Sequence, residues 1–217
     1  MKSFWRYEEL QNCCSTQTLA IERIRRGEYE FPFALSCQQQ TDGFGRRGDA
    51  WIESGKSVAL SLGWRVEEVA SKPDQRWPSW ISFWVRQALV DYAPELNPQL
   101  RLKWPNDLVV GQRKLGGVLV SQFIYDTQTF RVAGIGLNIA WINPQPSIFS
   151  PIDLESVLGR TVDRSQVIER ILDGVAQGLV SQINQEVLDA AVDDLLIQAQ
   201  PCEFLPQNKQ DKDNKVL

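Results

Sequence analysis

The 217-residue chain contains no histidine. Histidine is the side chain that most often serves as a general base and as a metal ligand, so its absence removes the commonest candidates for both roles. Any chemistry must rely on lysine, arginine, aspartate, asparagine and backbone amides, with or without a Mg²⁺ ion carried by a substrate.

The sequence also lacks the segments that direct a protein into or across a membrane. No apolar run approaches the ~18 residues of a membrane span, and the N-terminus holds no apolar signal core. The four cysteines, at positions 13, 14, 37 and 202, form no C-x-x-C pattern, and we expect reduced thiols. We therefore expect a cytoplasmic protein without a membrane partner.

Composition bounds the size of the core and the class of partner. With 43% hydrophobic residues, the chain is long enough for one domain with a substantial core, or one domain with a small appendage. The formal net charge of −4 implies no general affinity for nucleic acid, although it allows a local basic site.

The most distinctive stretch is residues 40–51, which hold three glycines, two adjacent arginines and a final tryptophan. Glycine lets a backbone approach a ligand closely, and arginine grips a carboxylate or phosphate through a planar fork of donors. The loop therefore predicts a site for a nucleotide-like anion, with an ordinary surface hairpin as the alternative. It is not a P-loop, because G-x-x-x-x-G-K-[ST] is absent.

Hydrophobic periodicity predicts alternating helices and strands around this loop. The predicted strands are residues 31–37, 57–64, 100–103, 108–110, 114–124 and 130–139, the fourth and fifth forming a hairpin. The predicted helices begin near Ser15, Trp77, Asp163 and Glu186. Three tryptophans share one face of the second helix, and we interpret them as core rather than as a ligand site.

Three further polar clusters do not fit a core. Residues 15–17, Ser-Thr-Gln, open the first predicted helix, and helix capping alone would explain them equally well. Residues 103–107, Lys-Trp-Pro-Asn-Asp, precede the charged and glycine-rich residues 113–117, for which a turn with a solvated charge pair is the alternative. Gly134 and Gly136 lie in a predicted strand, which two glycines weaken unless something must fit there.

In this order the clusters resemble the catalytic domain of the biotin–protein ligases. That family reads Ser-Thr-Asn, then Gln-x-x-Gly-Arg-Gly-Arg-x-Gly-Arg-x-Trp, Lys-Trp-Pro-Asn-Asp, Lys-x-x-Gly and Gly-x-Gly-x-Asn. The matching residues here are 15–17, 40–51, 103–107, 114–117 and 134–138. The resemblance implies an α+β fold similar to class II aminoacyl-tRNA synthetases, a mixed β-sheet with helices packed on one side.

The resemblance also implies the activity of a biotin–[acetyl-CoA-carboxylase] ligase. Such an enzyme activates biotin with ATP to biotinyl-5′-AMP and then transfers biotin to one lysine of a carrier, usually the biotin carboxyl carrier protein of acetyl-CoA carboxylase. The attacking carboxylate is already ionised, so the first step needs no general base. Its difficulty is electrostatic, and positioned cations and backbone amides address it.

By this resemblance the site residues divide between the two substrates. Lys114, Arg46 and Asp107 are the predicted catalytic residues; Asp107 is also the candidate for a Mg²⁺ ligand and for orienting or deprotonating the carrier lysine. The residues implied for biotin are Ser15, Thr16, Gln17, Gln40, Phe44, Gly45, Arg46, Lys114 and Gly117. The residues implied for ATP are Arg46, Arg47, Trp51, Asn106, Lys114 and Asn138.

Three positions depart from the family pattern. Phe44 and Asp49 stand where the family usually has arginine, which lowers the positive charge of the loop, and Gln17 replaces the common asparagine. We expect activity to survive, because Lys114 and Arg46 are present. The alternatives are a biotin-binding module with little turnover and a lipoate or octanoate ligase–transferase of the same fold.

The resemblance sets expectations for the ends of the chain as well. Residues 1–200 are expected to form the catalytic domain, and residues 201–217 a polar, disordered tail in place of the SH3-like barrel of most bacterial members. The motifs begin by Ser15, so no DNA-binding helix-turn-helix domain and no DNA partner are expected. Several members dimerise through a sheet edge, which leaves a homodimer open.

Overall fold

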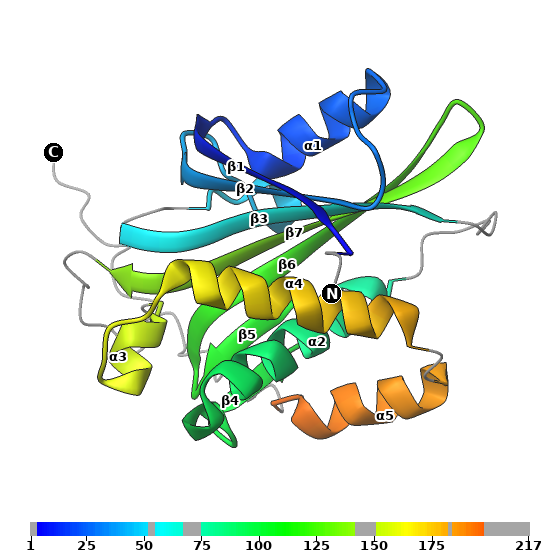
Figure 1. Cartoon of the computed structure of the whole chain (residues 1–217). Coiled ribbons are helices and arrows are strands. Elements are labelled where there is room, and N and C mark those ends of the chain that lie inside the picture. Colours follow the sequence, from blue (N-terminus) through cyan, green and yellow to red (C-terminus); the bar gives the residue numbers. More distant parts are fainter. Residues whose placement is uncertain (1–3, 52–54, 67–74, 142–150, 182–183, 198–217) are drawn as a thin grey trace, which may run out of the picture.

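One mixed sheet organises the fold of the computed structural model, which describes residues 4–51, 55–66, 75–141, 151–181 and 184–197. Its seven strands follow the order β1-β2-β3-β7-β6-β5-β4 (Figure 1). Their bounds are β1 Arg6–Cys13, β2 Phe33–Gln40, β3 Gly55–Val66, β4 Leu100–Lys103, β5 Asp107–Val110, β6 Arg113–Tyr125 and β7 Gln128–Trp141. β1 is parallel to β2 and the other neighbours are antiparallel, so the predicted mixed sheet is confirmed.

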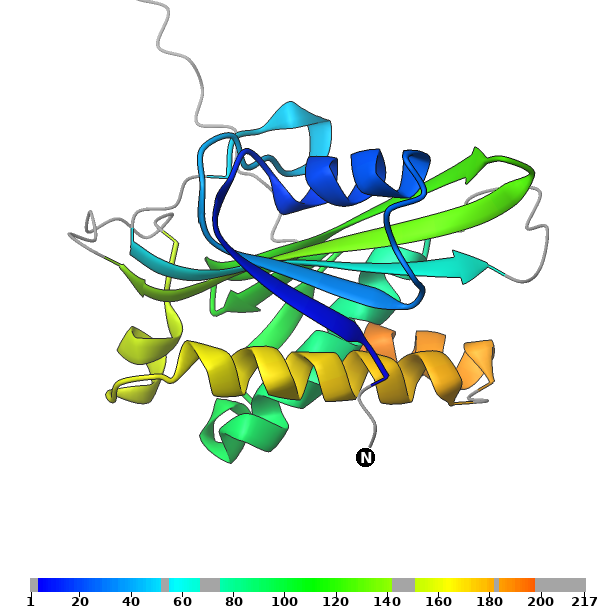
Figure 2. The same cartoon turned by 45° about the horizontal axis from the view of Figure 1, so that its top comes forward.

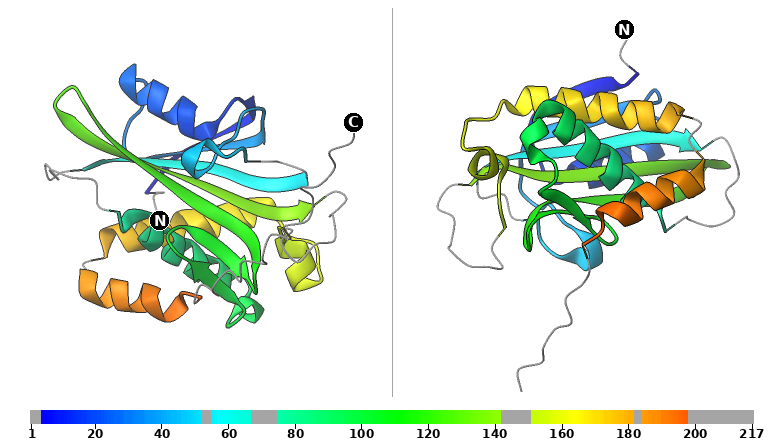
Figure 3. Two further views of the ribbon diagram at one scale, coloured as in Figure 1. Left: turned by 180° about the vertical axis from the view of Figure 1, so that it is seen from behind. Right: turned by 90° about the horizontal axis from the view of Figure 1, so that it is seen from below.

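The helices cover both faces of this sheet, and not one face as expected. Their bounds are α1 Thr16–Arg25, α2 Trp77–Tyr92, α3 Leu154–Leu158, α4 Arg164–Val180 and α5 Gln185–Leu195. α2, α4 and α5 form a layer on one face, and α1 lies alone on the other (Figures 1 and 3). None of the described helices is both long and apolar enough to cross a membrane.

Two hydrophobic clusters correspond to these two faces. Leu60 and Leu62 of β3 belong to the larger cluster, which fills the space between the sheet and the α2–α4 layer. Leu35 of β2 packs in the smaller cluster with Ala20 and Ile24 of α1, which crosses above the sheet in Figure 2. The second face thus holds a real but small core, because α1 contributes only a narrow apolar stripe.

Periodicity located most of the elements and missed two, β1 and α3. β1 is an edge strand whose residues are mostly exposed, so its sequence carries no apolar alternation, and its pairing with β2 defines it. α3 has five residues, too few to show a helical period; Asp153 accepts a hydrogen bond from the Ser156 amide at its start, and Gly159 ends it at φ 65°. The predicted tail, residues 201–217, lies outside the described residues.

The packing of α4 on α2 depends on glycine, which gives a stability prediction. A Cβ atom on Gly178 would lie 2.2 Å from the indole of Trp84, which is buried in the core. We expect Gly178→Ala to lower the free energy of unfolding in urea by about 1–3 kcal/mol, because overpacking outweighs alanine's helix propensity. Gly174→Ala, whose Cβ would approach Ala88 to 2.9 Å, should cost less. A gain in stability for Gly178→Ala would contradict this view of the interface.

Candidate functional site

A cavity of about 430 Å³ opens on the face of the sheet that carries α1. Loop 40–51, the start of α1 and strands β5 to β7 enclose it. Twelve predicted site residues line it: Ser15, Thr16, Gln17, Gln40, Phe44, Gly45, Arg46, Trp51, Asn106, Asp107, Lys114 and Gly117. Segments far apart in the sequence therefore meet at one place.

One end of the cavity is a buried network of hydroxyl and amide groups. Gln40 Oε1 accepts hydrogen bonds from the Thr16 amide at 2.8 Å and from Thr16 Oγ1 at 3.2 Å. Ser61 Oγ, fully buried on β3, donates to Thr16 Oγ1 at 2.9 Å. Ser15 also caps α1 by accepting from the Thr18 amide, so the capping interpretation is confirmed for a residue that also lines the cavity.

Gln17 closes the same end as a wall. Its Nε2 donates to Ser121 Oγ at 3.1 Å and to the Val132 carbonyl at 3.0 Å, and its Oε1 accepts from Ser61 Oγ at 3.3 Å. Gly134 of β7 leaves room for this wall: a Cβ atom there would lie 2.7 Å from Gln17 Oε1 and would have to displace the end of the Gln17 side chain. Sequence reasoning missed Ser61 and Ser121; the available signal was a serine within an otherwise apolar strand.

The cations lie beyond this polar end. Lys114 Nζ forms an ion pair with Asp107 Oδ1 at 2.7 Å, across the β5–β6 hairpin that places both side chains. Gly117 makes room for the pair, since a Cβ atom there would lie 3.1 Å from Asp107 Oδ1 and 3.3 Å from Lys114 Nζ. Arg46 approaches the same cavity from the loop.

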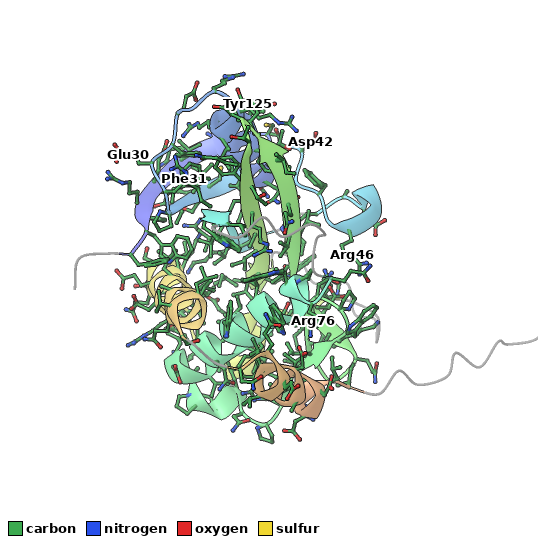
Figure 4. The ribbon with its side chains drawn as sticks, turned by 90° about the vertical axis from the view of Figure 1, so that its right-hand side faces the viewer. Glu30, Phe31, Asp42, Arg46, Arg76 and Tyr125 are labelled. Carbon is green, nitrogen blue, oxygen red and sulfur yellow. The ribbon has the colours of Figure 1, made fainter. Side chains whose placement is uncertain are left out.

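Loop 40–51 is both a hairpin and a cover for the cavity. Phe44 and Ala50 form a β-bridge, and the Trp51 amide donates to the Gly43 carbonyl at 2.8 Å. Figure 4 shows the loop standing out from the sheet, with Arg46 below its 3₁₀ turn and Asp42 where the loop leaves the sheet. The hairpin interpretation is therefore confirmed, and the anion site of this loop stays a prediction.

Trp51 ties the end of the loop to β7. A Cβ atom on Gly136 would lie 2.8–2.9 Å from three atoms of the indole ring, so this contact requires glycine. Trp51 Nε1 is buried, and none of the described residues accepts a hydrogen bond from it. An N–H group in this state is available to a ligand that brings an acceptor into the cavity.

The structure does not place two of the predicted nucleotide residues at the cavity. Asn138 is buried, and its Nδ2 donates to the carbonyls of Ile152 at 3.0 Å and Lys114 at 3.5 Å, so it ties β7 to neighbouring segments. Arg47 belongs to the 3₁₀ turn of the loop, and its side chain lies outside what the structure describes. Their contact with ATP stays a prediction.

Asp107 suits a metal ion that arrives with a substrate. It lines the cavity, and among the described residues no group of three or more acidic or cysteine side chains could hold a metal ion by itself. Mg²⁺ commonly binds through one or two carboxylates together with substrate phosphates and water. This donor set therefore fits Mg²⁺ shared with a nucleotide better than a resident ion.

The fold is a mixed sheet with helices on both faces, and its cavity joins a polar end to two cations. The chain belongs to the family described as "Biotin/lipoate A/B protein ligase family", whose profile matches residues 10–138. It is 34% identical over 166 residues to the biotin–[acetyl-CoA-carboxylase] ligase of Mycobacterium tuberculosis, and 27% over 149 residues to that of Paracoccus denitrificans. These matches cover 73% and 65% of this chain but only 58% and 60% of those relatives.

Solved structures agree with the fold. The biotin acetyl coenzyme A carboxylase synthetase of Helicobacter pylori with bound biotinylated ATP is 27% identical, with a TM-score of 0.60 over 79% of this chain and 74% of that one. The biotin protein ligase of Leishmania major in complex with biotinyl-5-AMP has a TM-score of 0.73 at 20% identity, covering 94% and 87% of the two chains. At that identity the second likeness supports the fold alone.

Proposed function

We propose that this chain is a biotin–[acetyl-CoA-carboxylase] ligase, which activates biotin with ATP to biotinyl-5′-AMP and transfers it to a lysine of a biotin carboxyl carrier protein. One observation carries the proposal: a cavity with a buried hydroxyl and amide network at one end also holds Lys114 and Arg46. The relatives named above bear this activity in their names.

The polar end of the cavity suits the ureido ring of biotin. A ureido group offers one carbonyl acceptor and two N–H donors, which hydroxyl and amide groups can meet on both sides. Ser15, Thr16 and Gln40 are the proposed partners, Gln17 bounds the ring, and Phe44 with Gly45 covers it. A lipoyl or octanoyl chain brings no hydrogen-bonding group to this end of the cavity, so the polar lining argues against those alternatives.

The charged residues suit the carboxylate end of biotin and the phosphates of ATP. Lys114 and Arg46 would bring two anions together and stabilise the charge that builds on the α-phosphate. Asp107 holds Lys114 in place before substrates bind, because their ion pair spans only 2.7 Å. This chemistry needs no histidine, in keeping with the composition of the chain.

The nucleotide would lie toward the loop and the turn between β4 and β5. The indole of Trp51 would contact the nucleotide. Asn106 lines the cavity, and its Nδ2 donates a hydrogen bond to the Val118 carbonyl at 2.9 Å. Arg47 and Asn138 are the further proposed contacts, and Mg²⁺ would be shared between the phosphates and Asp107. We place the enzyme in the cytoplasm, where thiols such as Cys14 and Cys37, which form no disulfide, stay reduced. Whether it works as a homodimer is left to a measurement of mass in solution.

Exchange of pyrophosphate into ATP tests the proposal. With the purified chain, we expect exchange that requires biotin and does not occur with lipoate or octanoate, because the ligand must fill the polar end of the cavity. Exchange driven by lipoate would favour the lipoate ligase alternative. Biotin binding without any exchange would show a binding module, and the enzyme assignment would then be wrong.

A further inference from the structure

Transfer of biotin to the carrier protein, the second half-reaction, needs a group that binds the positively charged acceptor lysine. The acceptor lysine arrives as an ammonium ion, and the chain has no histidine to handle it. The carboxylates that line the cavity among the described residues are Asp49 and Asp107. Asp107 is committed to Lys114 at 2.7 Å, so receiving a second cation would compete with that ion pair.

Asp49 is differently placed. It is exposed on the loop, and its carboxylate forms no ion pair or side-chain hydrogen bond with any described residue. Its backbone is fixed: the Asp49 carbonyl accepts from the Gly45 amide at 2.7 Å, and its amide donates to the Arg46 carbonyl at 3.3 Å. An anion without a partner among the described side chains is therefore held in the cavity wall, three positions after Arg46.

We propose that Asp49 binds the ammonium group of the acceptor lysine and orients it for attack on biotinyl-5′-AMP. This inference rests on the proposed function and gives to Asp49 the role that the sequence suggested for Asp107. An exposed carboxylate attracts an ammonium ion at short range, and solvent reaches it to carry protons away.

During transfer the acceptor nitrogen loses two protons and replaces AMP on the biotin carbonyl carbon. The ammonium group gives one proton to the Asp49 carboxylate, which releases it to water, and the neutral nitrogen attacks the carbonyl carbon of the mixed anhydride. A carbon–nitrogen bond forms, and the bond from that carbon to the phosphate oxygen breaks, so AMP leaves with the electron pair. The second proton on nitrogen passes to water as the amide forms.

The same carboxylate should hinder the first half-reaction. ATP and biotin are both anions, and Asp49 adds negative charge to the wall that Lys114 and Arg46 make positive. Removing the charge of Asp49 is therefore expected to act in opposite directions on the two steps. Substitution of a residue with a merely structural role would not speed one half-reaction and slow the other.

The test compares a charged and an uncharged nucleophile. Synthetic biotinyl-5′-AMP is supplied to the full chain, and single-turnover transfer is measured to Nα-acetyl-lysine amide, a cation, and to hydroxylamine, which is neutral at pH 7. We expect Asp49→Asn to slow transfer to the lysine amide about fivefold, the size of one exposed charge interaction, and to leave hydroxylamine unaffected. Biotin-dependent pyrophosphate exchange should become faster.

Asp42→Asn is the matched control, because Asp42 is an exposed carboxylate of the same loop that does not line the cavity. It should leave transfer to both nucleophiles unchanged. Equal slowing with both nucleophiles, or no change with either, for Asp49→Asn would overturn the role of Asp49 while the proposed function stands. Absence of exchange and of transfer by the unaltered chain would instead overturn the proposed function, and the role of Asp49 with it.

Discussion

Lys114→Ala is expected to lower biotin-dependent pyrophosphate exchange by about 10²–10³-fold, the typical effect of removing one positioned donor to developing charge. The variant loses the cation that would neutralise the reacting anions. It also leaves Asp107, which Lys114 holds at 2.7 Å, as an uncompensated negative charge beside them. Exchange rates at saturating biotin and ATP, with circular dichroism to show that the variant folds, measure this effect.

A second change separates the two causes. In the double variant Lys114→Ala with Asp107→Asn, the uncompensated charge is gone, so part of the affinity for the biotin carboxylate that Lys114→Ala loses, measured without ATP and Mg²⁺, should return. Arg160→Ala is the matched control, because Arg160 forms an ion pair with Glu95 away from the cavity, and its exposed fraction of 46% is close to the 45% of Lys114. An unchanged exchange rate in Lys114→Ala would show that this residue is not catalytic.

The sequence was informative where a local pattern determines the structure. Ser15 at a helix start and the apolar stripe of α2 depend on neighbours within a few residues, and the structure confirms both. The sequence did not predict that helices cover both faces of the sheet. α1 carries few apolar residues, and they form a core only together with residues of β2 and β7.

The polar network of the cavity was beyond local patterns. Ser61 was part of a correctly predicted strand, yet its importance arises from Thr16 and Gln17, which are 45 and 44 positions away. The part that Ser121 plays follows only from the hydrogen bond that Gln17 Nε2 donates to its Oγ in the folded chain. Motif resemblance supplied the members of the site, while pairings such as Lys114 with Asp107 required coordinates.

Two glycines on β7, Gly134 and Gly136, lie beside different ends of the cavity, and we expect their substitution to affect different substrates. Gly134→Ala places a Cβ atom 2.7 Å from Gln17 Oε1, and Gly136→Ala places one 2.8–2.9 Å from the Trp51 ring. We expect the first to raise the KM for biotin and the second the KM for ATP, each by about tenfold or more, since overpacking costs about 1–3 kcal/mol. Steady-state exchange rates over a range of each substrate measure both constants.

Each substitution serves as the control for the other, because both add one methyl group to the same strand. Relief of the contact provides a further check: Gln17→Asn shortens the side chain by one methylene and should restore biotin affinity in Gly134→Ala, and Trp51→Phe should relieve Gly136→Ala. If both glycine variants raised the same KM, the two ends of the cavity would not bind different substrates. The contacts of Gln17 and Trp51 with alternate residues of β7, Gly134 and Gly136, would then be a feature of packing, and the division of the site between ring and nucleotide would be wrong.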